Sequence, residues 1–224
     1  MASFSVQMPF MPVRAEQAIP FAAFVQRRGA RRLWVGQAKY AEQHQLFAYA
    51  AGLGIRVAAG TGISVMLFRH PYEAAVQARS VAAITGHPMV AGFGPGAVAL
   101  QRQMLGRPFA SQLTAVREYT TIVRALLAGS AVDQRGEYFS FTGELTRVPS
   151  PRVEVGLGVL RPNMARLAGE IADTVITWLT PASYLSGQLL PALRAGAQAA
   201  GRPVPRAVAI VPVALRRPGP DPAE

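Results

Sequence analysis

Short apolar runs alternate along the chain with longer segments whose apolar residues recur at helical spacing, and this alternation predicts strands joined by helices. The predicted strands are Phe4–Met8, Leu33–Gly36, Arg56–Gly60, Met89–Phe93, Arg152–Gly158, Thr174–Leu179 and Val208–Leu215. The predicted helices are 16–28, 41–51, 71–85, 114–127, 164–171 and 181–200. A small strand or hairpin is expected at Gly136–Phe141, beside the main body.

The order of these elements favours an α/β fold with a parallel sheet, because parallel neighbours need a crossover of about a dozen residues or more. The strands are almost continuously apolar, as expected of a sheet buried on both faces. A doubly wound open sheet and a (β/α) barrel both fit, and spacing alone does not decide between them. A full barrel takes roughly 250 residues, whereas this chain has 224. We assign 1–216 to one domain and 217–224 to a tail rich in proline and glycine.

Composition excludes several classes of function. The chain has no cysteine, which removes disulfides, thiolate metal sites and a cysteine nucleophile. No apolar run approaches the ~18 residues of a membrane-spanning helix. The first ten residues lack the basic start and the long apolar stretch of a signal peptide. We therefore expect a cytoplasmic protein with no metal site and no membrane partner.

The net charge of +11 comes almost entirely from arginine, since Lys39 is the only lysine. A genome rich in G and C favours arginine by itself, and attraction to an anionic partner is the functional alternative. The arginines are scattered, and no stripe of basic and aromatic residues indicates a nucleic-acid site. We expect no nucleic-acid partner and favour a phosphorylated small molecule or an acidic peptide.

Three glycine-rich clusters follow predicted strands, at Gly60–Ser64, Gly92–Gly96 and Gly156–Met164. Ligands bind beyond the carboxyl ends of the strands in both candidate architectures. Glycine there lets the backbone approach a flat ring or a phosphate, although each cluster by itself also suits a tight turn. The third cluster is only a weak dinucleotide motif, because Arg161 replaces its last glycine. A helix that begins at Asn163 or Met164 would still offer free N–H groups to a phosphate.

An ordered series of motifs resembles the luciferase-like monooxygenases across about residues 3–215. The series is Leu33–Val35, Ala59–Ile63, Arg69–Ala75, Ala91–Gly96, Glu118–Leu127 and Met164–Asp173. The resemblance implies a TIM-like barrel, shortened here to about seven parallel strands, that holds either FMN or the deazaflavin F420. It is strongest for the F420-dependent branch, so F420 is the expected cofactor and FMN the alternative.

The resemblance also implies where the cofactor lies. Family members of this branch have a bulge in the third strand, often with a non-proline cis peptide, that backs the deazaflavin ring, and Gly62–Ile63 match it. The phosphate would bind on the turn from Gly158 to Met164, with Arg161 contacting the phosphate or the acidic tail. The cofactor-binding candidates are Gln7, Thr61, Gly62, Ile63, Gly94, Gly96, Gly156, Gly158, Arg161, Pro162 and Met164.

The chain departs from the family where relatives carry an Asp-His or Glu-His pair after the second strand. Gln37 and Ala38 occupy these positions. Gln37 can donate and accept hydrogen bonds, but it does not titrate. Tyr40, Glu42 and His44 are the nearest proton carriers in sequence, and His44 can equally be a histidine on a helix face. The candidate catalytic residues are Gln37, Tyr40 and His44.

Four other residues of chemical interest are assigned to the structure. Glu118 and Asp173 match family positions and are interpreted as structural carboxylates, either at helix ends or buried. Trp34 and Trp178 lie on predicted strands and are interpreted as core residues.

The resemblance suggests a particular reaction. Short F420-type members of the family share the sequences at Trp34–Gln37, His44–Phe47 and Gly156–Pro162, and they are associated with clusters that make peptide natural products. This implies hydride transfer to an activated C=C bond, such as dehydroalanine or dehydrobutyrine in a lanthipeptide-type precursor. An FMN-dependent monooxygenase and a non-catalytic cofactor-binding relative are the alternatives. An open barrel would expose strand edges, so a homodimer is expected.

Overall fold

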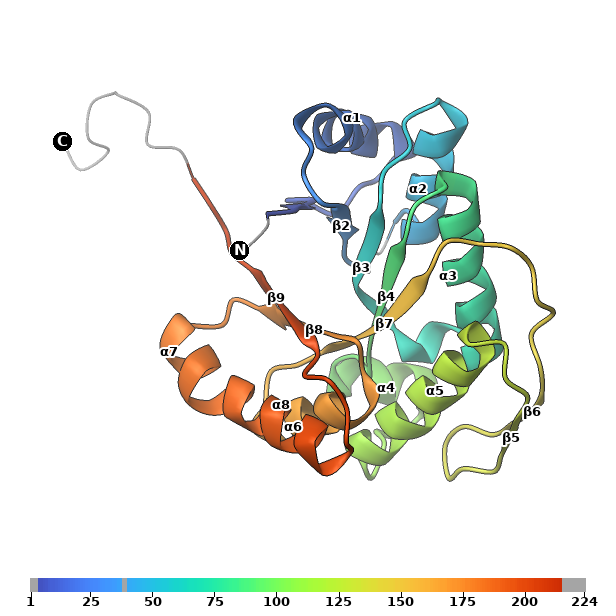
Figure 1. Ribbon diagram of the computed structural model, residues 1–224, viewed down its shortest axis with the longest axis vertical. Coiled ribbons are helices and arrows are strands. Elements are labelled where there is room, and N and C mark those ends of the chain that lie inside the picture. Colours follow the sequence, from blue (N-terminus) through green and yellow to red (C-terminus); the bar gives the residue numbers. More distant parts are fainter. Residues whose placement is uncertain (1–3, 38–39, 215–224) are drawn as a thin grey trace.

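The computed structural model describes residues 4–37 and 40–214. Seven strands form one parallel sheet in the order β1-β2-β3-β4-β7-β8-β9. The strands are β1 (Val6–Gln7), β2 (Leu33–Val35), β3 (Ala59–Val65), β4 (Met89–Gly94), β7 (Val153–Gly158), β8 (Thr174–Trp178) and β9 (Arg206–Ile210). The sheet curls into a barrel that stays open between its edge strands β1 and β9 (Figure 1). The predicted parallel α/β barrel of seven strands is confirmed.

The helices pack on the outside of the curled sheet (Figure 1). They are α1 (Ile19–Arg28), α2 (Gln43–Gly52), α3 (Pro71–Thr85), α4 (Val98–Leu105), α5 (Gln112–Leu127), α6 (Pro162–Ile171), α7 (Ala182–Tyr184) and α8 (Leu190–Ala199). Helices α2, α3, α5, α6 and α8 contact one another in that order and form a continuous outer layer. Gly86 follows the last residue of α3, and its φ of 70° is the left-handed conformation that glycine adopts without a steric penalty.

The apolar core has two parts. The larger part lies between the sheet and the outer helices and includes Leu33, Met89, Tyr119 and Leu157. The smaller part fills the inside of the barrel, where the buried residues are Trp34, Val90 and Ile176, with Ile63, Val208 and Ile210 packed against them. Filling the interior with side chains is usual for barrels of this type, so the inside is a packed core and no pore.

The predicted third strand, Arg56–Gly60, was placed too early, because β3 runs from Ala59 to Val65. Gly60 indicated the end of a strand, but it lies within β3. A Cβ on Gly60 would stand 2.5 Å from the Trp34 ring, so glycine is needed there to make room for an indole inside the barrel. The last strand was predicted at Val208–Leu215, but β9 is Arg206–Ile210, so both its start and its end come earlier in the chain than predicted. Helix α4 was not predicted at all.

A small hairpin is present as the antiparallel pair β5 (Val132–Gln134) and β6 (Phe141–Gly143), but the predicted residues Gly136–Phe141 form mostly its loop. Glu118 on α5 holds the loop of this hairpin. Its carboxylate accepts three backbone N–H groups, from Glu137 and Tyr138 at 2.8 Å each and from Phe139 at 2.9 Å. The structural role expected for Glu118 is thus accounted for by its contacts. Asp173 likewise accepts from Arg124 and from the N–H of Val155, each at 3.0 Å.

We expect Glu118→Gln to lower the free energy of unfolding by about 1–2 kcal/mol, because a carboxamide oxygen is a weaker acceptor than a carboxylate for three N–H groups. The loop between β5 and β6 should also become the first site of limited proteolysis. Glu73→Gln is the matched control, since Glu73 is exposed and accepts one side-chain hydrogen bond, from Gln77, within the part of the chain that the structure describes. Equal stability and equal proteolysis of the two variants would show that Glu118 does not hold the loop.

Among the described residues, no helix is long and apolar enough to cross a membrane. The tail assigned to 217–224 lies outside the described residues, as does Ala38.

Candidate functional site

Strand β3 is bulged where it faces β4. Thr61 pairs with Ala91, and the next pair is Ser64 with Phe93. Gly62 and Ile63 of β3 therefore lie opposite the single residue Gly92 of β4. The peptide bond between Gly62 and Ile63 is cis. The bulge and the cis bond implied by the family resemblance are therefore both present.

Thr61 ties the bulge to β4. Its hydroxyl donates to the carbonyl of Gly92 at 3.2 Å and accepts from the N–H of Gly92 at 2.9 Å. These bonds satisfy backbone groups that the bulge leaves without a ladder partner. Thr61 is fully buried, so this predicted cofactor residue shapes the bulge and offers no surface of its own to a ligand.

The ends of two strands meet beside the Ile63 side chain. A Cβ on Gly94 would lie 3.0 Å from Ile63 Cδ1, and a Cβ on Gly158 would lie 3.1 Å from Ile63 Cγ2. Gly94 ends β4 and Gly158 ends β7. The two glycines therefore make room for Ile63 at the C-terminal end of the barrel, which is the end where ligands bind in this architecture.

The other two candidate glycines, Gly96 and Gly156, are explained by the local backbone conformation and by packing. A Cβ on Gly156 in β7 would lie 3.1 Å from Ile176 Cδ1 inside the barrel. Gly96 lies in the turn before α4 with a φ of 76°, a conformation that other residues rarely adopt. Packing explains Gly156 and turn geometry explains Gly96.

Gln37 lies against the bulge. Its backbone N–H donates to the carbonyl of Ile63 at 3.0 Å, and its side-chain oxygen accepts from the N–H of Val65 at 3.4 Å. Gln37 thus connects the end of β2 to both sides of the bulge. It supplies hydrogen bonds at the barrel mouth and no titrating proton.

The N-terminus of α6 follows β7 at the same end of the barrel. Arg161 precedes the helix in an extended conformation, is exposed, and makes no side-chain cap bond. Pro162 has no N–H, and the N–H of Ala165 makes the first helical bond, to Arg161 at 3.0 Å. The N–H groups of Asn163 and Met164 are therefore the free donors of the first turn, where the helix dipole favours an anion.

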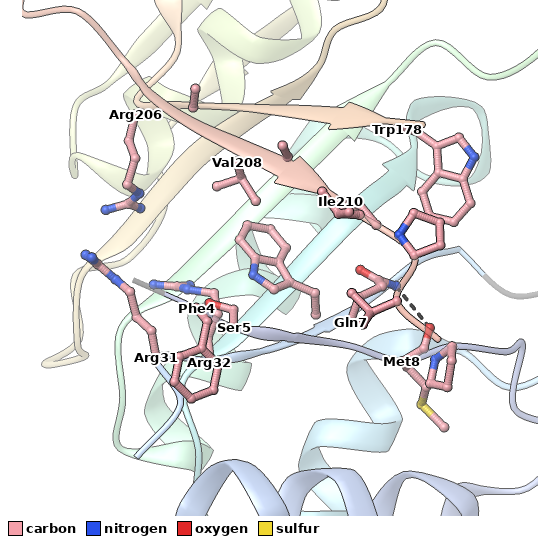
Figure 2. Close-up of a pocket in the computed structure, with 17 residues that line it drawn as sticks. Phe4, Ser5, Gln7, Met8, Arg31, Arg32, Trp178, Arg206, Val208 and Ile210 are labelled. Carbon is pink, nitrogen blue, oxygen red and sulfur yellow. Dashed lines mark hydrogen bonds between the residues drawn. The ribbon is translucent and has the colours of Figure 1, made fainter. Parts of the chain in front are cut away.

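A slot of ≈ 850 Å³ lies between the edge strands β1 and β9, a volume typical of ligand pockets. Residues of 4–9 line one side and residues 206–213 the other. Figure 2 shows that Arg31, Arg32 and Arg206 gather at one end of the slot. The other end, at the carboxyl ends of β1 and β8, carries Gln7 and Trp178.

The arginine end of the slot lies where the strands begin. Arg206 contacts Glu154, and it donates to the hydroxyl of Thr174 at 3.2 Å. Arg32 donates to the carbonyl of Ala59 at 2.7 Å. Burial, followed by the charge of the nearby Arg206, lowers the pKa of Arg32 from 12.5 to about 10. Glu154 therefore balances only part of the positive charge at this end.

Two polar side chains that line the slot have buried atoms without a hydrogen-bond partner among the described residues, the indole Nε1 of Trp34 and the amide Oε1 of Gln7. Gln7 otherwise donates to the carbonyl of Met8 at 3.3 Å. Trp178 is 52% exposed, so the expectation of a core residue was wrong for Trp178 and right for Trp34. Trp178 ends β8 next to the slot, where it is paired with Ile210 at the end of β9.

His44 is buried in a charged cluster formed with Glu42 and Arg69. Its Nδ1 lies 2.8 Å from one carboxylate oxygen of Glu42, and the Arg69 guanidinium lies 3.1 Å from the same oxygen. The other oxygen of Glu42 caps α2 by accepting from the N–H groups of His44 and Gln45. Burial alone would raise the pKa of Glu42, but the hydrogen bond from His44 and the charges of His44 and Arg69 lower it to about 2.

Some of the predicted site residues therefore lie close together in the structure, and others do not. Gln37, Gly62, Ile63, Gly94 and Gly158 meet at the bulge. Tyr40 is 69% exposed, and neither Tyr40 nor His44 is among the described residues that line the slot. Sequence reasoning missed Arg69 as the partner of Glu42, since 27 residues separate the two. It also missed the slot, whose walls come from opposite ends of the chain.

These features define the class of protein: a parallel (β/α) barrel with a bulged, glycine-flanked third strand at its ligand-binding end. The luciferase-like monooxygenase family matches residues 4–219. The chain therefore belongs to the luciferase-like monooxygenase family.

Curated relatives match part of the chain. An F420-dependent glucose-6-phosphate dehydrogenase of Nakamurella multipartita is 32% identical over 154 residues, which cover 66% of this chain and 45% of the relative. A 5,10-methylenetetrahydromethanopterin reductase of Methanopyrus kandleri is 28% identical over 172 residues, covering 68% and 48%. The chain thus spans about half the length of these relatives. A solved F420-dependent secondary alcohol dehydrogenase in complex with an F420-acetone adduct shares the fold, with a TM-score of 0.79 at 18% identity, covering 93% of this chain and 68% of that one.

Proposed function

We propose that this chain uses reduced F420 to reduce an activated carbon–carbon double bond, and that its substrate is a peptide containing dehydroalanine or dehydrobutyrine. The observation that carries the proposal is the Gly62–Ile63 bulge at the barrel mouth, flanked by Gly94 and Gly158. Two of the proteins named above, the glucose-6-phosphate dehydrogenase and the secondary alcohol dehydrogenase, are F420-dependent, which supports F420 over FMN.

The residues present suit a phosphorylated deazaflavin. Ile63 would back the ring, and the free N–H groups of Asn163 and Met164 would bind the phosphate. Arg161 is exposed beside them and would contact either the phosphate or the acidic tail. The net charge of +11 on the chain also favours a ligand with several negative charges, such as F420 with its phosphate and acidic tail. When bound, reduced F420 supplies a hydride.

The reduction adds a hydride to the β-carbon of the substrate and a proton to its α-carbon, so the double bond becomes a single bond and F420H2 becomes F420. Gln37 has no proton to exchange at neutral pH, and its role is to orient and polarise the substrate amide. His44 is paired with Glu42 through Nδ1. We therefore assign the proton to water, with the exposed Tyr40 as the alternative donor.

The test is single-turnover oxidation of F420H2 by a peptide that contains dehydroalanine. We expect loss of the reduced cofactor together with a peptide that has gained two hydrogen atoms. In D2O, deuterium should appear at the α-carbon and hydrogen at the β-carbon. Turnover only with reduced FMN and oxygen would instead support a monooxygenase. No turnover with either cofactor would support a non-catalytic relative.

Among the expectations from the sequence that remain predictions, two concern the protein as a whole. One is the cytoplasmic location. The other is the homodimer, which light scattering tests. The strand edges that motivated the dimer face each other across the slot, so a dimer should use other exposed apolar side chains, such as Met11 and Val13.

A further inference from the structure

We propose that the chain has a second anion site, at the end of the barrel where the strands begin, and that it binds the phosphate groups of a small phosphorylated ligand. A pocket of ≈ 310 Å³ lies there between α3, the last turn of α5 and the segment that leads into β7. This volume lies at the lower end of the range for small-molecule pockets. The inference goes beyond the proposed function, because it needs neither the deazaflavin nor its reaction.

The pocket lies away from both edges of the sheet. Helices α3 and α5 contact the central strand β7, and Figure 1 shows them on the opposite side of the barrel from the edge strand β9. Val153 begins β7 and Gly158 ends it, so about 16 Å of strand separates the pocket from the turn that would hold the deazaflavin phosphate. The two anion sites therefore lie at opposite ends of the same strand.

Three arginines from three different elements line the pocket: Arg79 of α3, Arg124 of α5, and Arg152, which directly precedes β7. Arg79 donates to the carbonyl of Thr146, and Arg124 donates to the carbonyl of Ile171 at 2.6 Å. These carbonyls hold two of the guanidinium groups in place without neutralising them. Arg152 is exposed, and its side chain has no hydrogen-bond or ion-pair partner among the residues that the structure describes.

The negative charge at the pocket is smaller than the positive charge. Asp173 is the one carboxylate among the described residues that line it. One oxygen of Asp173 accepts from Arg124 at 3.0 Å and from Arg202 at 3.3 Å, and the other accepts from the N–H of Val155 at 3.0 Å. The C-terminal end of α5 adds roughly half a negative charge from its free C=O groups. Three guanidinium groups therefore face only about one and a half negative charges.

Glu154, the neighbouring carboxylate in β7, does not remove this excess. Successive side chains of a strand point to opposite faces, so Val155 lines the pocket while Glu154 lies on the other face and contacts Arg206. Arg202 adds further positive charge behind the pocket. Burial, followed by the charge of Arg124, lowers the pKa of Arg202, which agrees with positive charges that crowd one another.

A phosphate group fits this arrangement better than a carboxylate does. Guanidinium groups bind both kinds of anion through paired N–H donors. A carboxylate offers two oxygens in one plane, whereas arginines that converge from three elements can surround the oxygens of a tetrahedral phosphate. Ser150 lines the same pocket and supplies a hydroxyl donor. The expected ligand therefore carries a phosphate monoester or a diphosphate, and its binding would tie α3 and α5 to the start of β7.

The test measures binding of inorganic diphosphate and of succinate, a dicarboxylate, by titration calorimetry at near-physiological ionic strength. We expect diphosphate to bind at least about tenfold more tightly than succinate. Arg152→Gln and Arg79→Gln should each weaken the binding of diphosphate about tenfold. Arg27→Gln is the matched control, because it removes the same charge from an exposed position on α1, away from the pocket, and it should leave the affinity unchanged.

Thermal unfolding gives an independent readout, because a ligand that binds only the folded chain raises the unfolding midpoint. Diphosphate should raise the midpoint of the native chain and of Arg27→Gln, but that of Arg152→Gln much less. Equal effects on all three proteins would show attraction to the net charge of +11 alone and would overturn the proposal. Binding that is lost in Arg161→Gln but kept in Arg152→Gln would place the anion on the turn before α6, which also overturns it, as would succinate binding as tightly as diphosphate.

Discussion

Gly92→Ala is expected to lose about 3 kcal/mol of unfolding free energy, because the new methyl group has no room. A Cβ on Gly92 would lie 2.2 Å from the carbonyl oxygen of Thr61 and 2.4 Å from Ile176 Cδ1. The first of these is a backbone atom at the start of the bulge, so relief requires β3 to move away from β4. That movement would also break the two hydrogen bonds between Thr61 and Gly92. The loss is a large share of the 5–15 kcal/mol that is typical of a folded domain.

Gly94→Ala is the matched control in the same strand. Its Cβ would meet only the end of the Ile63 side chain, at 3.0 Å, and a side-chain end can shift at small energetic expense. We expect a loss under about 1 kcal/mol for this variant. Urea unfolding of both variants makes the comparison, and a Gly92→Ala protein as stable as Gly94→Ala would contradict the described packing of the bulge.

Glu42→Gln is expected to cost about 2–3 kcal/mol at pH 7, since it leaves the charge of Arg69 without its partner. The Arg69 side chain is only 10% exposed, and its Nη1 has no hydrogen-bond partner among the described residues. The expected loss of unfolding free energy is smaller than for a fully buried ion pair, because the Glu42 side chain is 26% exposed. The carboxamide that replaces the carboxylate could still cap α2, so the effect isolates the charge.

The pH dependence of this loss has a definite sign. The folded-state pKa of Glu42 is about 2, below its ordinary value of 4.5. A lowered pKa stabilises the fold at pH values above 4.5, and this contribution disappears as the pH falls toward 2. The stability difference between the native chain and Glu42→Gln should therefore shrink over that window. Glu170→Gln is the control, because its partner Arg117 is half exposed and such surface pairs contribute little. A difference between native and Glu42→Gln that stays constant from pH 7 to pH 2 would rule out the charged cluster.

The sequence predicted the architecture well because its signals were local. Alternating strand and helix patterns gave seven parallel strands, and the motif around Gly62–Ile63 gave the bulge and the cis bond through family resemblance. Local signals misled at Gly60, where a glycine that accommodates Trp34 resembled a strand end. They gave no indication of α4, which directly follows the cluster at Gly92–Gly96.

The site was less predictable because its parts depend on tertiary contacts. Nothing near His44 in sequence indicates that Arg69 completes its cluster. Trp178 sits in an apolar run that favours burial, yet it is the last residue of β8 and lines the slot. The slot joins β1 to β9, about 200 residues apart, so its charged end at Arg32 and Arg206 becomes visible only when the sheet has curled.

The central claim is that the bulge and the N-terminus of α6 form a deazaflavin site. Titration of the protein with F420 and, separately, with FMN tests it most directly, with ligand fluorescence or heat as the signal. We predict saturable binding of F420 with a micromolar or smaller Kd, and binding of FMN at least about tenfold weaker. Tighter binding of FMN, or no binding of either ligand, would contradict the account.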